Sequence, residues 1–179
     1  MTITELEHFI SQQGKDVYSF CMHLTGNKEE GEELYQDTFL KAVELAKKII
    51  NTQNPKSFIL SIAIRLWNNK KRKYGWRQRI VPMDYYDFFE ENGYSQIEIA
   101  DDSCPEKEIL RREMCLAIRE EIQKLPDKLR IPIYLYYSAG LSYEEIGVCL
   151  KLSKGTVKSR LHRGRMIIKK ELEDTGYDR

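Results

Sequence analysis

Hydrophobic residues recur at helical spacing through most of the chain, and no stretch alternates convincingly in the way that a half-buried strand requires. Residues 3–25 carry a roughly helical apolar stripe that ends at Thr25-Gly26-Asn27, and a second helix is predicted from about Lys28 to Ile50. The buried stripe of this second helix is predicted to comprise Tyr35, Phe39, Ala42, Val43, Ala46, Ile49 and Ile50. These two patterns indicate a helical first half.

A third helix is predicted from Phe58 to about Lys73, after the polar loop Asn51–Lys56 and with Ser57 as its N-cap. Its first half is apolar on nearly every side, from Leu60 to Trp67. Because a helix that contacts one neighbour needs only one apolar stripe, more than one neighbour must cover this helix.

The second half of the chain is also helical in pattern. One helix is predicted at Glu106–Lys124 and another at Lys128–Ser138, separated by Leu125-Pro126-Asp127. A short helix then begins after Ser142, which with Glu145 three residues later forms the pattern of a capping box. A break at Lys151-Leu152 precedes a last helix that Ser153 caps. The sequence therefore predicts an all-α fold with two small helical domains.

The last helix has two unlike faces. Val157, Leu161, Gly164 and Ile168 lie on one side at spacings of four, three and four. The opposite side carries Gly155, Ser159, His162, Arg163 and Met166. Residues 154–170 include seven Lys or Arg and no acid. A basic second helix after a capped short helix is typical of a DNA-binding helix-turn-helix. The alternative is a solvated amphipathic helix at the end of a bundle.

Charge is unevenly distributed along the chain, although its net value is only +1. Residues 65–79 hold seven Lys or Arg and no acid, whereas residues 84–108 hold nine acids and one Lys. Two basic blocks thus flank an acidic one, and local fields decide which surface meets DNA. We interpret residues 80–105 as an acidic, flexible linker that separates a domain at 1–79 from one at 106–179.

The first basic block contains aromatic residues at Trp67, Tyr74 and Trp76. Rings that stack on bases and cations that meet phosphates suit a single strand or a melted duplex. The alternative is a basic helix end whose tryptophans belong to the core, and for each aromatic residue alone core packing is an equal explanation.

Motifs for catalysis, metal binding and membrane insertion are absent from the sequence. There is no phosphate-binding glycine loop, nucleophile elbow or His-Glu-x-x-His motif. The cysteines do not form a Cys-x-x-Cys pair, and Cys21-Met22-His23 is interpreted as an ordinary helix position. No apolar run reaches about 20 residues, and the N-terminus does not resemble a signal peptide. We expect a cytoplasmic protein that is not an enzyme and has no catalytic residues, metal or cofactor.

Two separated stretches resemble bacterial RNA polymerase sigma factors. Residues 33–42 (Glu-Leu-Tyr-Gln-Asp-Thr-Phe-Leu-Lys-Ala) resemble the core-binding segment of this family. Leu125-Pro126, residues 141–146 (Leu-Ser-Tyr-Glu-Glu-Ile) and residues 155–163 resemble its promoter-binding second domain. The chain length and single linker are similar to the small extracytoplasmic-function (ECF) group. The two halves would then be sigma region 2 and sigma region 4.

The resemblance implies a role for each surface. It places the β′ clamp helices of core polymerase on Glu33, Gln36, Asp37, Leu40 and Lys41. It places the −10 promoter element on Arg65, Asn69, Lys70, Lys71, Arg72, Lys73 and Trp76. It places the −35 element on Lys154, Thr156, Lys158, Ser159, Arg160, His162, Arg163 and Arg165. Among the last set, Ser159, His162 and Arg163 would reach base edges, and Lys158, Arg160 and Arg165 phosphates.

The resemblance also implies partners: the β′ and β subunits of core polymerase, promoter DNA, and an anti-sigma factor that is often membrane-bound. The sequence departs from the family pattern where Ile64-Arg65 replaces Arg-Asn, where Gly147 replaces Ala, and where Lys151 replaces the turn glycine. A −10 preference therefore cannot be carried over. The rival functions are a helix-turn-helix repressor or activator and, from an enzyme class, a DNA recombinase.

Overall fold

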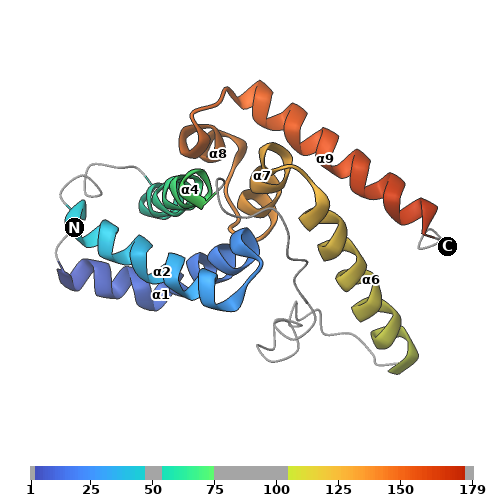
Figure 1. Cartoon of the computed structure of the whole chain (residues 1–179), viewed down its shortest axis with the longest axis horizontal. Coiled ribbons are helices and arrows are strands. Elements are labelled where there is room, and N and C mark those ends of the chain that lie inside the picture. The colour runs from blue at the N-terminus through green and yellow to red at the C-terminus, as the bar shows by residue number, and fades with distance from the viewer. Residues whose placement is uncertain (1–2, 47–53, 75–104, 176–179) are drawn as a thin grey trace.

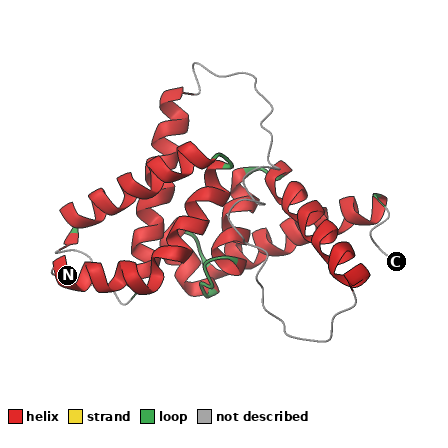
Figure 2. Ribbon diagram, turned by 90° about the horizontal axis from the view of Figure 1, so that it is seen from below, coloured by secondary structure: helices red, strands yellow, loops and turns green. Residues whose placement is uncertain are grey.

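The computed structural model describes residues 3–46, 54–74 and 105–175, and these form seven helices and no strand (Figures 1 and 2). The helices are α1 Ile3–Thr25, α2 Lys28–Glu44, α4 Pro55–Tyr74, α6 Pro105–Lys124, α7 Asp127–Tyr137, α8 Tyr143–Leu150 and α9 Lys154–Asp174. The predicted all-α class is confirmed. The end of the predicted second helix, Trp76 and nearly all of the predicted linker lie outside the described residues.

Helices α1, α2 and α4 pack together at one end of the molecule (Figure 1). Helix α7 lies near the middle, and α6 and α9 extend from it toward the other end. Helix α8 packs on both α9 and α4. The second half of the chain thus contacts the first half directly through α7 and α8.

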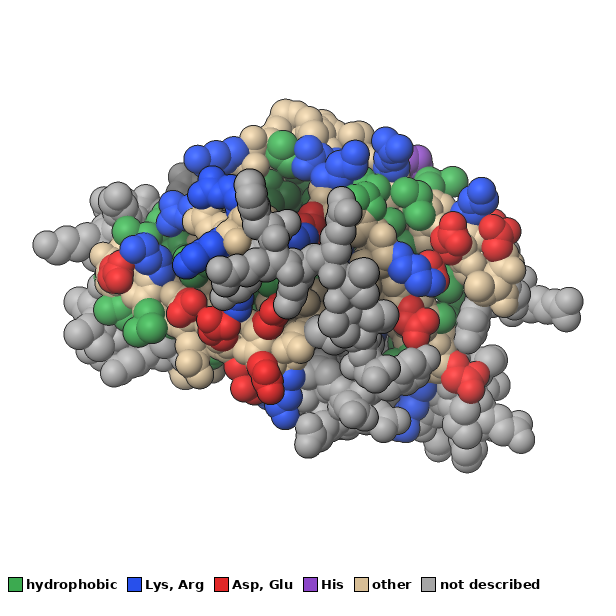
Figure 3. Space-filling view, viewed as in Figure 1, with side chains coloured by type: hydrophobic (Ala, Val, Ile, Leu, Met, Phe, Trp, Pro, Cys, Tyr) green, Lys and Arg blue, Asp and Glu red, His purple; other side chains and the backbone are tan. Residues whose placement is uncertain are grey.

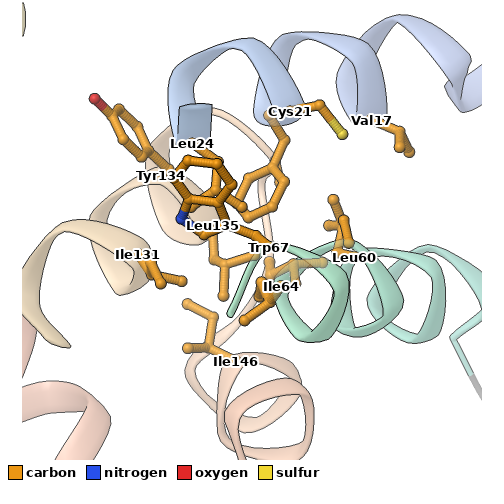
Figure 4. Close-up of a cluster of buried hydrophobic side chains, with 14 of the residues drawn as sticks. Val17, Cys21, Leu24, Leu60, Ile64, Trp67, Ile131, Tyr134, Leu135 and Ile146 are labelled. Carbon is orange, nitrogen blue, oxygen red and sulfur yellow. The ribbon is translucent and has the colours of Figure 1, made fainter. Parts of the chain in front are cut away.

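Helix α4 is buried on several sides, as the sequence predicts, because α1, α2 and α8 all pack on it. The core runs without interruption from the first half into the second. Figure 4 shows its central part, where Leu24 of α1, Ile64 and Trp67 of α4, and Leu135 of α7 converge with Ile146 of α8. The relative placement of the halves does not follow from the helix pattern alone.

Polar side chains cap the N-terminal ends of α2, α8 and α9, as well as that of α4. Asn27 accepts a hydrogen bond from the Glu30 amide at the start of α2. The predicted capping box of α8 is confirmed, since Ser142 and Glu145 bond each other's backbone amides. Ser153 accepts from the Thr156 amide at 3.1 Å, which confirms the predicted cap of α9. These bonds satisfy amides that have no partner inside the helix.

The predicted cap of α4 is wrong. The Ser57 amide donates to the Asn54 side chain at 3.0 Å, so Asn54 holds the capping position and Pro55 begins the helix. Proline suits a first helical position because its missing amide hydrogen would have no acceptor there. Ser57 is instead only 5% exposed, and its hydroxyl donates to the backbone oxygen of Glu145 in α8 at 3.2 Å.

The buried stripe of α2 also differs from the prediction: Leu34 and Thr38 belong to it, Tyr35 and Ala46 are only partly buried, and Val43 lies outside it. Leu34, Thr38, Phe39 and Ala42 are buried, whereas Val43 is 49% exposed. Val43 follows Leu40 by three residues, which places both on the same outer side of the helix. Ile49 and Ile50 lie outside the described residues.

The turn between α8 and α9 depends on the backbone conformation of Lys151 and on the absence of a side chain at Gly147. Lys151 adopts a left-handed conformation, with φ 55° and ψ 47°. This lets the Leu152 amide donate to the Gly147 oxygen at 2.8 Å. A Cβ on residue 147 would lie 2.8 Å from the Leu152 oxygen, so the turn requires glycine there.

We expect Lys151→Gly to raise the free energy of unfolding by about 1 kcal/mol, because glycine has no Cβ to strain the left-handed conformation. Urea unfolding followed by circular dichroism measures the change. Lys151→Ala is the matched control, since it removes the same side chain but keeps the Cβ and should not stabilise. Equal effects of the two substitutions would contradict the assignment of strain to residue 151.

Candidate nucleic-acid interfaces

Helix α9 is fixed to its domain by the apolar face that the sequence predicts. Val157 and Leu161 are buried, and Ile168 packs partly against the core. A Cβ on Gly164 would lie 2.6 Å from the Cδ1 atom of Ile133, so α9 and α7 approach more closely than a larger side chain would allow. This close packing leaves the opposite face of α9 toward solvent.

The exposed face of α9 carries most of the residues predicted to meet DNA. The exposed members are Lys154, Lys158, Ser159, His162, Arg163 and Arg165. Thr156 and Arg160 are half-buried, and the Thr156 hydroxyl lies 2.8 Å from that of Ser153. The short side chains therefore lie near the start of α9, where a recognition helix meets base edges.

An ion pair joins α8 to the start of α9. Lys154 forms an ion pair with Glu144, and this contact holds the pKa of Glu144 below its ordinary value. Both groups are more than half exposed, so the pair contributes little to stability. A phosphate could therefore replace Glu144 as the partner of Lys154 at small cost.

The structure adds an aromatic pair that the sequence analysis missed. The rings of Tyr136 and Tyr143 are stacked, with centroids 5.2 Å apart. The Lys158 ammonium lies over the Tyr143 ring at 5.7 Å from its centroid. These contacts orient Lys158 beside the exposed face of α9. Because the two tyrosines come from different helices, no spacing in the sequence brings them together.

The second basic group lies on the last turns of α4. Arg65, Asn69, Arg72 and Lys73 are exposed there. Figure 3 shows Lys and Arg side chains gathered over the upper part of the molecule, where α4, α8 and the start of α9 lie in Figure 1. Trp76, the aromatic member of the residue set predicted to meet the −10 element, lies outside the described residues.

Two lysines of this block are paired with acids. Lys70 bonds Glu33 of α2 at 2.5 Å, and Lys71 bonds Asp127 of α7 at 2.6 Å. Burial alone would raise the pKa of Asp127, but Lys71 and Arg130 outweigh burial and hold that pKa below its ordinary value.

Trp67 is 8% exposed, which favours the interpretation that this residue belongs to the core.

The outer side of α2 presents the residues predicted to bind polymerase. Glu33, Gln36, Asp37 and Leu40 are exposed, and Lys41 is half-buried and bonds Glu44 at 2.5 Å. Leu40 is 65% exposed and Val43 adds a second apolar side chain to this side. Two exposed apolar residues with acids beside them form a surface suited to protein binding.

The shielded side chains of Cys21, Cys149 and His23 are poorly placed to react. Burial raises the pKa values of Cys21 and Cys149 to about 12. Burial, followed by the charge of Arg119, lowers the pKa of His23 to about 4. No cluster of metal-binding side chains and no helix long and apolar enough to cross a membrane occurs in the part of the chain that the structure describes.

Two family models match successive parts of this chain. Residues 9–77 match the Sigma-70 region 2 family, and residues 115–168 match the Sigma-70 region 4 family. The ECF RNA polymerase sigma factor SigW of Bacillus subtilis is 35% identical over 164 residues, covering 88% of this chain and 83% of SigW. The RNA polymerase sigma-H factor of Pseudomonas aeruginosa is 30% identical over 159 residues, covering 88% and 80%.

A solved structure has the same fold. The sigma factor RpoE of Bartonella quintana, in complex with the anti-sigma factor NepR, superimposes with a TM-score of 0.70 over 99% of this chain and all of the other. At 19% identity this likeness supports the fold alone. The two family matches in chain order, together with the identity to SigW over most of both proteins, show that this chain belongs to the ECF group of RNA polymerase sigma factors.

Proposed function

We propose that this sigma factor meets promoter DNA through α9 and the end of α4, meets core RNA polymerase through α2, and catalyses no reaction itself. The observation that carries the proposal is the two-sided character of α9, which is buried along Val157 and Leu161 and exposed and basic on the other side. The domain at 1–79 would serve the polymerase and the −10 element, and the domain at 106–179 the −35 element, with 80–105 between them.

In the proposed −35 contact, Ser159, His162 and Arg163 face base edges in the major groove. Arginine can donate two hydrogen bonds to a guanine edge, which makes Arg163 the strongest candidate for sequence discrimination. Lys158 and Arg165 reach phosphates on either side, with Lys158 placed by the Tyr143 ring. The half-buried Arg160 is the least accessible of the predicted phosphate contacts.

In the proposed −10 contact, the exposed cations Arg65, Arg72 and Lys73 meet phosphates while Asn69 faces a base. Lys70 and Lys71 would exchange their carboxylate partners for phosphates, which carry the same sign of charge. Each exchange would free an acid, Glu33 on the polymerase-binding side of α2 or Asp127 on α7. DNA binding and the contacts of these acids are therefore coupled in the proposal.

The proposed polymerase contact is centred on Leu40 and Val43, with Glu33, Gln36, Asp37 and Lys41 around them. An apolar centre with a polar rim is the usual arrangement of a protein interface. The clamp helices of β′ are the proposed occupant, and the second domain would meet the β subunit. Because polymerase acts there, we place the protein in the cytoplasm.

An anti-sigma factor is a further proposed partner. The similar solved sigma factor is itself in complex with an anti-sigma factor. Co-purification of this chain with the membrane fraction tests whether this partner is membrane-bound. The helix-turn-helix repressor and the recombinase are not favoured by the family matches.

We expect Asp37→Arg to weaken binding to core polymerase about tenfold or more, because it places a cation where the proposed interface carries acids. Surface plasmon resonance with immobilised core polymerase measures the affinity. Lys15→Glu, a charge reversal at an exposed position of α1, is the control and should leave the affinity unchanged. Equal affinity of Asp37→Arg and the parent protein would exclude this side of α2.

We expect Arg163→Ala to cost about 1–3 kcal/mol at one base pair of the −35 element if its guanidinium reads a base. Competition binding by the polymerase complex, with each base pair of the element changed in turn, locates the loss. A uniform loss across all sequences would make Arg163 a phosphate contact instead.

We expect binding of promoter DNA to weaken with salt at a log–log slope near −5, since neutralising about six phosphates releases about that many counterions. Equilibrium binding between 50 and 200 mM salt, which is roughly the range over which such losses are measured, gives the slope. A flat response would contradict the charge argument for α4 and α9.

A further inference from the structure

Met166 is an exposed apolar side chain on the basic face of α9. It is 53% exposed, whereas Val157, Leu161 and Gly164 of the same helix are buried. Helix α9 lies at an edge of the molecule, and α6, α7 and α8 pack against its other side (Figure 1). Packing against these helices therefore does not account for a methionine at this position.

The side chain of Met166 shares a face of α9 with the three residues proposed to reach base edges. Met166 follows Ser159 by seven residues, His162 by four and Arg163 by three, which are the spacings of side chains on one helical face. At about 100° per residue, Met166 points within about 20° of the mean direction of those three residues. It therefore faces whatever surface they face.

Cations lie on both flanks of this strip. Lys158 and Arg165, which are seven residues apart, follow one side of it, and the half-buried Arg160 lies on the other. The Lys158 ammonium is held on its side by the Tyr143 ring. A helix about 10–12 Å across fills a major groove about 12 Å wide, so cations on its flanks meet the phosphates of the groove walls. The strip between the flanks, with Met166 in it, then meets the base edges.

The basic character of α9 continues beyond Met166. Lys169 and Lys170 follow it and are both exposed, and no acid occurs in residues 154–170. Glu173, which pairs with Lys169 at 3.3 Å, lies two turns further along the helix. A protein partner would need a strongly acidic surface around its apolar contact, whereas DNA supplies negative charge along both edges of the groove. The surroundings of Met166 therefore favour DNA as its partner.

One group in the major groove suits an apolar side chain. The C5-methyl group of thymine is exposed there, and apolar side chains distinguish thymine from other bases by contact with this methyl group. Methionine is unbranched, flexible and polarisable, so its side chain can adjust to the position of a small apolar group. Contact removes both apolar surfaces from water, which favours binding.

We propose that Met166 is a specificity-determining residue that contacts the C5-methyl group of a thymine in the −35 element. The inference rests on the −35 contact proposed above for α9, and adds to it a residue that reads a base without hydrogen bonds. In a zinc finger, three side chains spread over about seven residues of a helix contact three successive bases. The thymine is therefore expected about two base pairs from the base pair that Ser159 meets.

The test removes the methyl group and leaves the hydrogen-bonding edge of the base unchanged. Core polymerase is combined with this protein, and sequencing of the transcripts started in vitro identifies a promoter. In duplexes of that promoter, each thymine of the −35 region is replaced in turn by deoxyuridine, which lacks only the C5-methyl group. Competition binding by the polymerase complex gives the relative affinity for each duplex.

We expect one thymine at which deoxyuridine weakens binding about threefold or more, as the loss of one buried methyl group implies. Met166→Ala should bind the thymine and deoxyuridine duplexes equally at that position. Met166→Leu, which keeps an apolar side chain of similar volume, should retain most of the discrimination. Alanine favours the helix and the site is exposed, so Met166→Ala should keep the circular dichroism of the parent protein.

Met114→Ala is the matched control, because Met114 is also exposed, at 42%, but belongs to α6. It should discriminate thymine from deoxyuridine as the parent protein does. A scan in which no thymine responds would overturn the inference, and so would a response that Met166→Ala retains in full. Weaker binding of Met166→Ala to core polymerase without DNA would assign the residue to a protein contact and overturn the inference as well.

These outcomes are distinct from failure of the proposed function. A complex that starts specific transcripts but shows a flat methyl scan loses only the role of Met166. A complex that starts no specific transcript would reject the proposed function, and the role of Met166 with it.

Discussion

The burial of α4 is the constraint on which the remaining structure depends. This helix is apolar on more sides than α1 and α2 can cover, and α8 of the second half covers part of the remainder. The same helix ends in the cations proposed to meet DNA that is being opened. Packing between the halves and the proposed DNA contact therefore involve the same helix.

Helix α9 packs mainly within its own half of the chain. Its buried face is fixed by Val157, Leu161 and the close approach at Gly164, and most of its cations lie on the exposed face. The outer side of α2 is exposed in the same way through Leu40 and Val43. The proposed −35 and polymerase surfaces are therefore both accessible in the described structure.

Local chemistry made much of the fold predictable from the sequence. The caps at Ser142 and Ser153 follow from side chains that bond the next turn of their own helices, and the two faces of α9 follow from its period. The cap of α4 was mispredicted because Asn54 and Ser57 are both good capping residues, and only the contact of Ser57 with Glu145 shows which one enters the helix. Val43 was mispredicted because two neighbouring stripes on α2 are both apolar.

Contacts between distant residues were not predictable in this way. The pairing of Lys71 with Asp127 and the stack of Tyr136 on Tyr143 join separate helices, and one sequence contains no spacing that reports them. The apolar character around α4 did predict that several neighbours cover it, but not that one of them is the helix-turn-helix. The roles of individual residues in binding DNA and polymerase remain predictions from the resemblance.

The most direct measurement of the account is promoter-specific transcription in vitro by core polymerase supplied with this protein, with the transcript start sites identified by sequencing. The account predicts specific start sites that appear when the protein is added and that are weakened by Asp37→Arg in α2 and by Arg163→Ala in α9. Start sites that are the same without the protein, or that both substitutions leave unchanged, would contradict it.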